Sequence, residues 1–139
     1  MNNPITIETT VSAPINKIWE YWNNPEHITK WAYASDDWEA PEAENDLRAG
    51  GRFRTKMAAR DGSTSFDFSG TYMAVVENQF LEFSLDDGRL VRVEFSQLPE
   101  GVKIVEIFEA ETENTRELQK SGWQAILNNF KNYAERKGN

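Results

Sequence analysis

The fold is decided by one long amphipathic stretch, residues 114–136, which reads NTRELQKSGWQAILNNFKNYAER. Asn114 can cap the first turn of a helix while Glu117 reaches back to it, and the helical pattern continues to about Arg136 before Lys137-Gly138. At ~1.5 Å per residue, this helix is ~35 Å long. We therefore predict a helix that is long enough to cross a whole β-sheet.

A broad apolar face runs along this predicted helix. Steps of 100° per residue bring the following residues to that face: Leu118, Gly122, Trp123, Ile126, Leu127, Phe130 and Tyr133. Gln119 lies near the middle of the face, where it either bonds a neighbouring backbone group or makes a polar contact inside a ligand cavity. Gly122 costs about 1 kcal/mol relative to alanine, so it indicates a close backbone contact or free volume at this point.

The sequence before this helix begins with one predicted strand and two short helices. Residues 5–11 alternate apolar and polar side chains, which is the period of a half-buried strand. Ser12 can act as the N-cap of a first helix with an apolar face over 15–22, and Asn24-Pro25 opens a second helix that runs through Trp31. We expect the two helices to form a V beneath a sheet.

An acidic loop and five further strands are predicted between these helices and the long one. The periodicity disappears from Ser35 to Ala49, where six acidic residues face one base, Arg48, so we interpret this segment as a solvated lid. Gly50-Gly51 indicates a bulge that enters a strand. Alternating segments follow at about 52–59, 66–76, 80–86, 89–97 and 102–110. The order β-α-α-β-β-β-β-β-α predicts an α+β fold, with a curved six-stranded antiparallel sheet over a long C-terminal helix, in a single domain, 1–139.

The composition excludes several classes of function. The 139 residues contain no cysteine, which rules out disulfides and thiolate catalysis, and the net charge of -8 disfavours nucleic acid as a partner. No window approaches the ~20 apolar residues that span a bilayer and no basic leader is present, so we expect a cytoplasmic protein without a membrane span. His27 is the only histidine and the acids of 35–49 lack calcium-loop spacing, so we expect no metal, no cofactor and no catalytic residue.

A single long helix over a curled sheet also predicts a cavity. Such a helix often meets the sheet well at one end only, and the gap at the other end is where pockets of ~300–1,000 Å³ lie. The chain has more aromatic residues than a minimal core requires. We expect these side chains to lie nearest the cavity: Trp31, Trp38, Phe53, Phe68, Tyr72, Trp123 and Leu127. Gln119 or Tyr72 would then orient a ligand.

One acid on the predicted sheet has two interpretations. Alternation places Glu106 on one face of its strand and Arg92 and Glu94 on one face of the preceding strand, so the three can form a cluster. If that face is outward, the cluster is a solvated cross-strand pairing. If it is inward, Glu106 is the candidate buried acid or base, because loss of solvent would raise its pKa.

Several short motifs follow one another in a recognisable order. They are Ala13-Pro14 before a Trp-containing helix, Trp22-Asn23-Asn24-Pro25-Glu26-His27 with Trp31, Gly50-Gly51-Arg52-Phe53, Gly70-Thr71-Tyr72, and Gly122-Trp123 with Leu127. Together, and over nearly the entire chain, they resemble the family named for the activator of the heat-shock-protein-90 ATPase, within the START-like (SRPBCC), pollen-allergen-like superfamily. The resemblance implies a helix-grip fold.

The superfamily contains carriers, enzymes and co-chaperone domains, so the resemblance leaves three functions open. The first is non-catalytic binding of a hydrophobic small molecule, lipid-like or polyketide-like, between the sheet and the C-terminal helix. The second is a stress-related co-chaperone module, in which the acidic loop meets a basic surface on the chaperone. The third is a polyketide cyclase-like enzyme with a buried acid. For each we expect a monomer or a weak homodimer.

Overall fold

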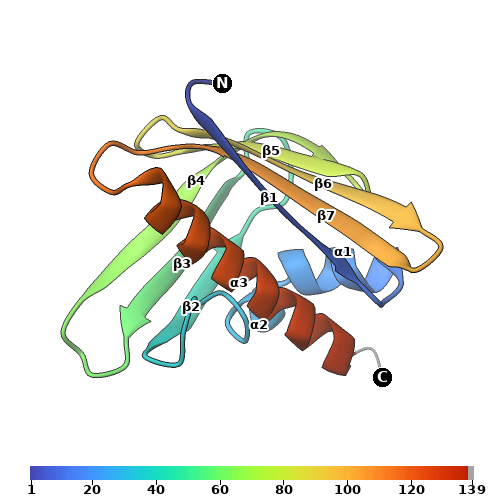
Figure 1. Cartoon of the computed structure of the whole chain (residues 1–139), viewed down its shortest axis with the longest axis horizontal. Coiled ribbons are helices and arrows are strands. Elements are labelled where there is room, and N and C mark those ends of the chain that lie inside the picture. The colour runs from blue at the N-terminus through green and yellow to red at the C-terminus, as the bar shows by residue number, and fades with distance from the viewer. Residues whose placement is uncertain (138–139) are drawn as a thin grey trace.

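Seven antiparallel strands form one curled sheet in the computed structural model, which describes residues 1–137 (Figure 1). They are β1 (Pro4–Val11), β2 (Trp38–Asn45), β3 (Arg52–Ala59), β4 (Ser65–Val76), β5 (Phe80–Leu85), β6 (Leu90–Leu98) and β7 (Gly101–Glu109). Their order across the sheet is β1-β7-β6-β5-β4-β3-β2, so β1 pairs with the last strand, and β1 and β2 form the two edges. The predicted α+β architecture, a curved antiparallel sheet with a long C-terminal helix, is confirmed.

The predicted strand count was wrong by one, because the segment that we interpreted as an acidic loop contains β2. This edge strand pairs with β3, and its register shifts between Glu39 and Glu42, on either side of Pro41. Proline is tolerated on an edge strand, where its missing N–H has no partner to lose. The acids also have more basic partners than Arg48, since Arg54 of β3 lies 3.4 Å from both Glu42 and Glu44.

Three helices accompany the sheet among the described residues: α1 (Ile15–Asn23), α2 (Pro25–Ile28) and α3 (Arg116–Lys137). The predicted cap of α2 is confirmed, because the Asn24 side chain accepts a hydrogen bond from the Glu26 N–H at 3.0 Å, although the helix ends before Trp31. Ser12 is not the cap of α1, since Pro14 stands in that place.

The start of α3 also differs from the sequence-based expectation. Thr115 caps this helix, because its Oγ1 accepts from the Leu118 N–H at 3.1 Å, and Asn114 belongs to the preceding loop. Gly138, which we expected to follow the helix, lies outside the described residues.

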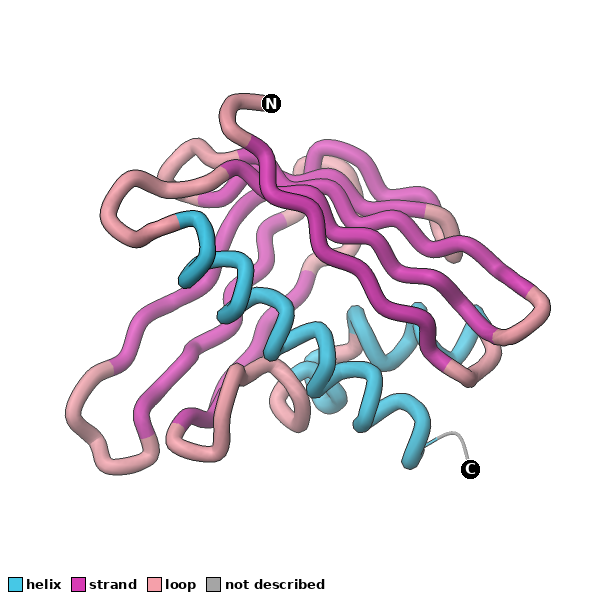
Figure 2. The backbone as a smooth tube through the Cα atoms, viewed as in Figure 1, coloured by secondary structure: helices cyan, strands magenta, loops and turns pink. Residues whose placement is uncertain are grey.

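The long helix α3 runs across the concave side of the sheet and lies close to β1 (Figure 2). Lys131 donates to the Thr10 carbonyl of β1 at 2.5 Å, and Gln124 donates to the Glu8 carbonyl at 3.3 Å. Leu127 and Phe130 of α3 are fully buried, and the Phe130 ring packs against Trp22 and Trp31. These contacts fix α3 along one edge of the sheet, while β3 and β4 lie on the far side of the curl (Figure 1).

Candidate functional site

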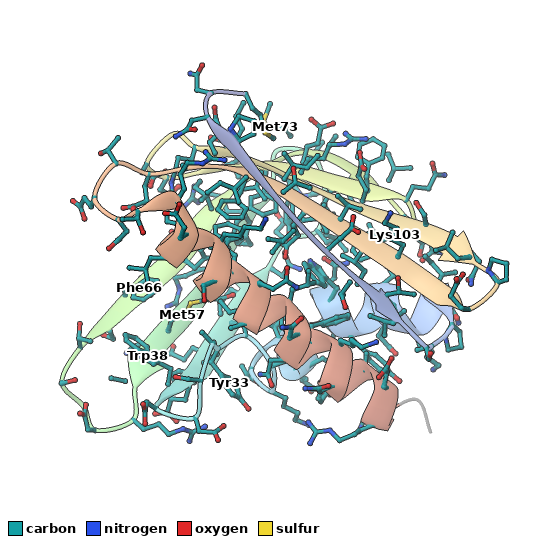
Figure 3. All side chains as sticks on the ribbon, in the orientation of Figure 1. Tyr33, Trp38, Met57, Phe66, Met73 and Lys103 are labelled. Atoms are coloured by element: carbon teal, nitrogen blue, oxygen red, sulfur yellow. The ribbon has the colours of Figure 1, made fainter. Side chains whose placement is uncertain are left out.

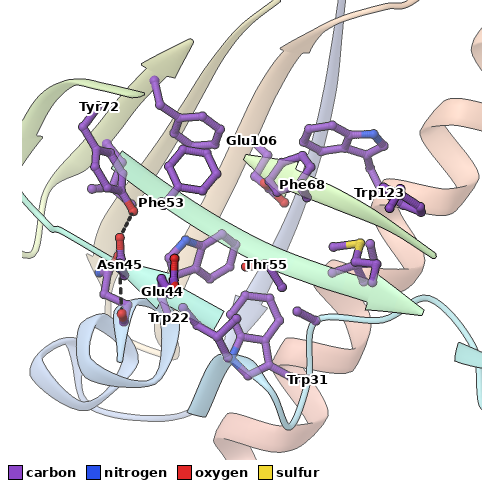
Figure 4. Close-up of a pocket in the computed structure, with 18 of the residues that line it drawn as sticks. Trp22, Trp31, Glu44, Asn45, Phe53, Thr55, Phe68, Tyr72, Glu106 and Trp123 are labelled. Carbon is purple, nitrogen blue, oxygen red and sulfur yellow. Dashed lines mark hydrogen bonds between the residues drawn. The ribbon is translucent and has the colours of Figure 1, made fainter. Parts of the chain in front are cut away.

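A cavity of about 250 Å³ lies between α3, the short helices and the half of the sheet that curls away from α3 (Figure 4). It is slightly smaller than the range expected from the sequence. Eight aromatic side chains line it: Trp22, Trp31, Phe53, Phe66, Phe68, Tyr72, Phe83 and Trp123. Aromatic rings bury a large apolar area with few rotatable bonds, so they form stiff walls.

Phe53 stands at the centre of the aromatic wall on the sheet. Its ring centroid lies 4.9 Å from that of Phe83, 5.2 Å from that of Tyr72 and 5.8 Å from that of Phe68. Gly70, which is directly opposite Phe53 in the β3–β4 register, makes this possible, because a Cβ there would lie 3.1 Å from the Phe53 ring and 2.3 Å from a backbone oxygen. The rings therefore support one another instead of collapsing into the cavity.

The helices supply the opposite walls. The rings of Trp22 and Trp31 lie 5.1 Å apart, and the Trp31 indole N–H donates to the Tyr21 carbonyl at 2.9 Å, which fixes its orientation. On α3, Trp123 stacks on Phe108 of β7 with a centroid distance of 3.9 Å and meets the edge of Phe68 at 5.7 Å.

The cavity reaches solvent at the end formed by β3 and β4. Met57 and Phe66 are cross-strand partners there, and both line the cavity (Figure 3). Phe66 is 53% exposed although it belongs to the concave face. Phe66 therefore stands between the cavity and solvent.

A chain of hydrogen bonds closes one corner of the cavity (Figure 4). The Tyr72 hydroxyl donates to Asn45 Oδ1 at 2.6 Å, and Asn45 Nδ2 donates to the Asn23 carbonyl at 2.7 Å. Burial raises the pKa of Tyr72 well above its usual range, so the hydroxyl keeps its proton. Tyr72 thus presents its ring to the cavity, while its hydroxyl joins β4 to β2.

Glu106 of β7 brings a buried carboxyl into the apolar lining of the cavity (Figure 4). It is 7% exposed and lies between Ile7 of β1 and Val93 of β6 in the strand register. Within residues 1–137 no hydrogen bond or ion pair includes the Glu106 carboxyl, which borders the cavity. Burial alone raises its pKa from 4.5 to about 8, so the group is mostly neutral at pH 7.

The predicted cluster of Glu106 with Arg92 and Glu94 does not form. Val93 is the residue opposite Glu106, so Arg92 and Glu94 project from the convex face of the sheet. There Arg92 bonds Glu94 and Glu82, each at 2.6 Å. The inward interpretation therefore applies to Glu106, and the outward interpretation applies to its two predicted partners.

Five of the eight predicted ligand-binding side chains line the cavity: Trp31, Phe53, Phe68, Tyr72 and Trp123. Leu127 does not, because the rotation of α3 turns it into the filled part of the core and brings the neighbouring Ile126 to the cavity instead. Trp38 does not either. It lies outside the cavity, where its ring meets the edge of Phe66 at 5.9 Å.

Gln119 is buried but serves the loop before α3. Its amide nitrogen donates to the carbonyls of Glu111 at 3.1 Å and Asn114 at 2.8 Å, and its oxygen accepts from the Glu111 N–H at 2.8 Å. Gln119 does not line the cavity, and both its amide nitrogen and its oxygen are bonded to this loop. The free-volume interpretation holds for Gly122, since a Cβ there would meet nothing within 4 Å.

Trp22, Thr55 and Met57 line the cavity but were not predicted to do so. A signal for two of them was present, because Thr55 and Met57 follow Phe53 at spacings of two along the same strand and so share its face. No comparable signal distinguishes Trp22 from the other aromatic residues of α1.

Two further classes of site have no support in the described part of the chain. No cluster of three metal-ligating side chains is found among residues 1–137. None of the helices in that range has the length and apolar character needed to cross a bilayer.

Comparisons with known proteins agree on one family. The model of the family described as activator of Hsp90 ATPase homolog 1-like protein matches residues 12–135. A solution NMR structure of an AHSA1-like protein from Aeromonas hydrophila is 45% identical, with a TM-score of 0.92 over 97% of this chain and 94% of that chain. A solution structure from Cytophaga hutchinsonii is 54% identical, with a TM-score of 0.84 over 98% and 94% of the two chains. No curated protein matches this chain.

Proposed function

The chain belongs to the family of activator of Hsp90 ATPase homolog 1-like proteins, and from that premise we propose that it binds a hydrophobic small molecule, without catalysis, in the cavity between the sheet and α3. The observation that carries the proposal is the cavity itself, about 250 Å³ walled by aromatic rings. A cavity of ~150 Å³ with apolar walls is already large enough to hold benzene. A ligand with two fused rings matches this volume better.

The apolar surface of an unfilled cavity supports an occupant. The walls are mainly aromatic and aliphatic side chains, and removing such surface from water contributes about 25 cal/mol per Å². Larger side chains in the lining or a closer helix would fill the space, so a chain that keeps these rings around an open volume is best explained by a molecule that occupies it.

The arrangement of polar groups favours binding over catalysis. Acid–base catalysis requires groups within hydrogen-bond reach of one another or of one substrate atom, about 2.6–3.2 Å. Glu106 has no such partner among the described residues, and His27 is held away from the cavity by a 2.5 Å contact between its Nδ1 and the Tyr133 hydroxyl. The cyclase-like alternative therefore has the least support.

A chaperone partner is the second candidate function, and the family description is the observation that favours it. The acids that we expected to meet a basic surface are partly neutralised, because Glu39 lies 3.7 Å from Arg60 and Glu42 lies 3.8 Å from Lys56. A pull-down with the middle domain of Hsp90 at low and high salt tests this candidate. Capture that weakens with salt would favour it, because a charge-led contact is screened.

A cavity-filling variant tests the small-molecule proposal. Thr55→Phe places a ring in the cavity, and we expect it to abolish binding of naphthalenemethanol, measured by calorimetric titration, while the protein stays folded. Thr6→Phe makes the same change on an exposed position of β1 and should bind like the wild type. Equal binding by both variants, or no binding by the wild type, would contradict the proposal.

A further inference from the structure

The strongest unexplained feature of the cavity is the unpartnered carboxyl of Glu106. At the other corner of the cavity, by contrast, the Tyr72 hydroxyl and Asn45 are bonded to each other. Glu106 has only apolar residues opposite it on both flanking strands, Ile7 and Val93. A buried polar group without a partner is costly and calls for an explanation, which a ligand at this position would supply.

The charged and titratable groups around the cavity leave Glu106 without a counter-ion. β1 and β6 present Ile7 and Val93 to it, and α3 presents Trp123 and Ile126 to the cavity. Three other titratable side chains line the cavity: Tyr72, Glu44 and Arg89. Tyr72 is bound to Asn45, Glu44 lies 3.4 Å from Arg54, and the Arg89 guanidinium lies 2.8 Å from Asp87.

We infer that the cavity takes an apolar organic cation, an amine carried on a ring-sized apolar body, whose ammonium group pairs with Glu106 between the aromatic walls. This inference rests on the proposed function and narrows it to one ligand class. Aromatic faces attract cations, and a carboxylate supplies the charge-assisted hydrogen bond that an ammonium group requires.

A cation fits this site better than an acid or a neutral molecule. Among residues 1–137, Arg89 is the one basic side chain in the lining, and it already has an acidic partner, so an anionic head group would meet no free positive charge from this part of the chain. The chain carries a net charge of -8, which attracts cations to its surface and repels anions. A purely apolar molecule would leave the Glu106 carboxyl without any partner, and a neutral polar molecule would offer it only an uncharged hydrogen bond, which is weaker than one to an ammonium group.

Pairing with an ammonium group also couples binding to a proton. Because burial raises the pKa of Glu106 to about 8, the carboxyl is mostly protonated at pH 7 and must lose that proton to pair with a cation. Amine binding should therefore release about one proton at pH 7, and the amine's affinity should rise by up to tenfold per pH unit between about pH 6 and 8. An alcohol of the same shape should show neither effect.

The test compares naphthylmethylamine with naphthalenemethanol by calorimetric titration at pH 6, 7 and 8, in two buffers of different ionisation enthalpy. At pH 8 we expect the amine to bind at least about tenfold more tightly than the alcohol. At pH 7 the amine should release a proton on binding, and the difference in heat between the two buffers measures that release. In Glu106→Gln the ratio of the two affinities should fall to about one and the proton release should disappear. Glu94→Gln, on the convex face, should behave like the wild type.

The outcomes separate this inference from the proposed function. If the alcohol binds and the amine shows neither an advantage nor proton release, the inference is wrong and small-molecule binding stands. If neither probe binds, both fail. The proton release is measured on the wild-type protein, so the inference stays falsifiable even if Glu106→Gln does not fold.

Discussion

Beneath β1, β7 and β6 the concave face is filled by branched aliphatic side chains, whereas beneath β3, β4 and β5 aromatic rings surround a cavity. In the first region six side chains are at most 3% exposed: Ile5, Ile7, Val91, Val93, Val102 and Ile104. Such side chains interdigitate and leave few voids. In the second region Phe53 makes tilted contacts with Phe68 and Tyr72 and an edge-to-face contact with Phe83, and these rings surround the open space.

The position of α3 explains the difference. Its bonds to the β1 carbonyls hold it against the filled region, so it stands away from the strands at the other end of the curl. One helix thus completes the core with one part of the sheet and covers a cavity with the other. Glu106 lies at the boundary, because its strand belongs to the filled region while its side chain enters the cavity.

The largest expected effect comes from two neighbouring residues of α3 that point into the two regions. Leu127→Ala removes a fully buried side chain from the filled region and should lower the free energy of unfolding by about 2–5 kcal/mol. Ile126→Ala removes a half-buried side chain from the cavity wall and should cost about 1 kcal/mol. Urea denaturation followed by circular dichroism measures both. Equal losses of unfolding free energy in the two variants would contradict the distinction between the filled region and the cavity wall.

The boundary acid should make stability depend on pH. The folded-state pKa of Glu106, about 8, lies above its ordinary value of 4.5, so the folded state holds the proton more tightly than the unfolded state does. This contribution to stability is fully present below about pH 4.5 and is lost as the pH rises toward 8. Relative to the wild type, Glu106→Gln should gain on the order of 1 kcal/mol of stability per pH unit across this window.

Urea denaturation of the wild type and Glu106→Gln at pH 5 and pH 8 checks this expectation. Glu94→Gln is the control, because Glu94 is exposed to solvent beside Arg92 and should show no such trend relative to the wild type. A constant difference between Glu106→Gln and the wild type would mean that Glu106 is not buried as a neutral acid.

A smaller expected effect tests whether Gln119 stabilises the fold or contacts a ligand. Gln119→Ala removes three hydrogen bonds to the loop before α3 and should cost about 1–3 kcal/mol of stability. Its affinity for naphthalenemethanol should equal that of the wild type, because the amide does not reach the cavity. Gln124→Ala, an amide on the β1 side of the same helix, should cost under about 1 kcal/mol. A loss of affinity for naphthalenemethanol in Gln119→Ala would mean that Gln119 belongs to the binding site.

Most strands were predictable because apolar and polar residues alternate and turn residues separate them, as in β3 and β5. β2 was not, because Pro41 and the register shift interrupt its alternation, and because the bases that pair with its acids lie on β3. The family resemblance gave the architecture, but no local pattern reveals an interrupted edge strand whose partner follows it in the chain.

The cavity could be predicted more reliably than its polar contacts. A helical wheel places Ile126 and Leu127 on the same face and cannot say which of them meets free volume, since the contacts of α3 with β1 set that rotation. The direction of Glu106 was equally undetermined, because nearly every residue around it in β7 is apolar and only the register with β6 shows which face is inward. Gln119 was expected to be buried, but its partners are backbone groups of a loop that has no periodic pattern, so they could not be predicted.

The most direct test of the account uses the five tryptophans as reporters of a bound molecule. Trp22, Trp31 and Trp123 line the cavity, whereas Trp19 packs edge-on against Phe95 in the core and Trp38 lies outside against Phe66. In a nitrogen-edited NMR titration with naphthalenemethanol, the account predicts that the indole N–H signals of the first three shift saturably while those of Trp19 and Trp38 stay nearly constant. Shifts confined to Trp38, or no saturable shift in any indole signal, would contradict the claim that this cavity receives a ligand.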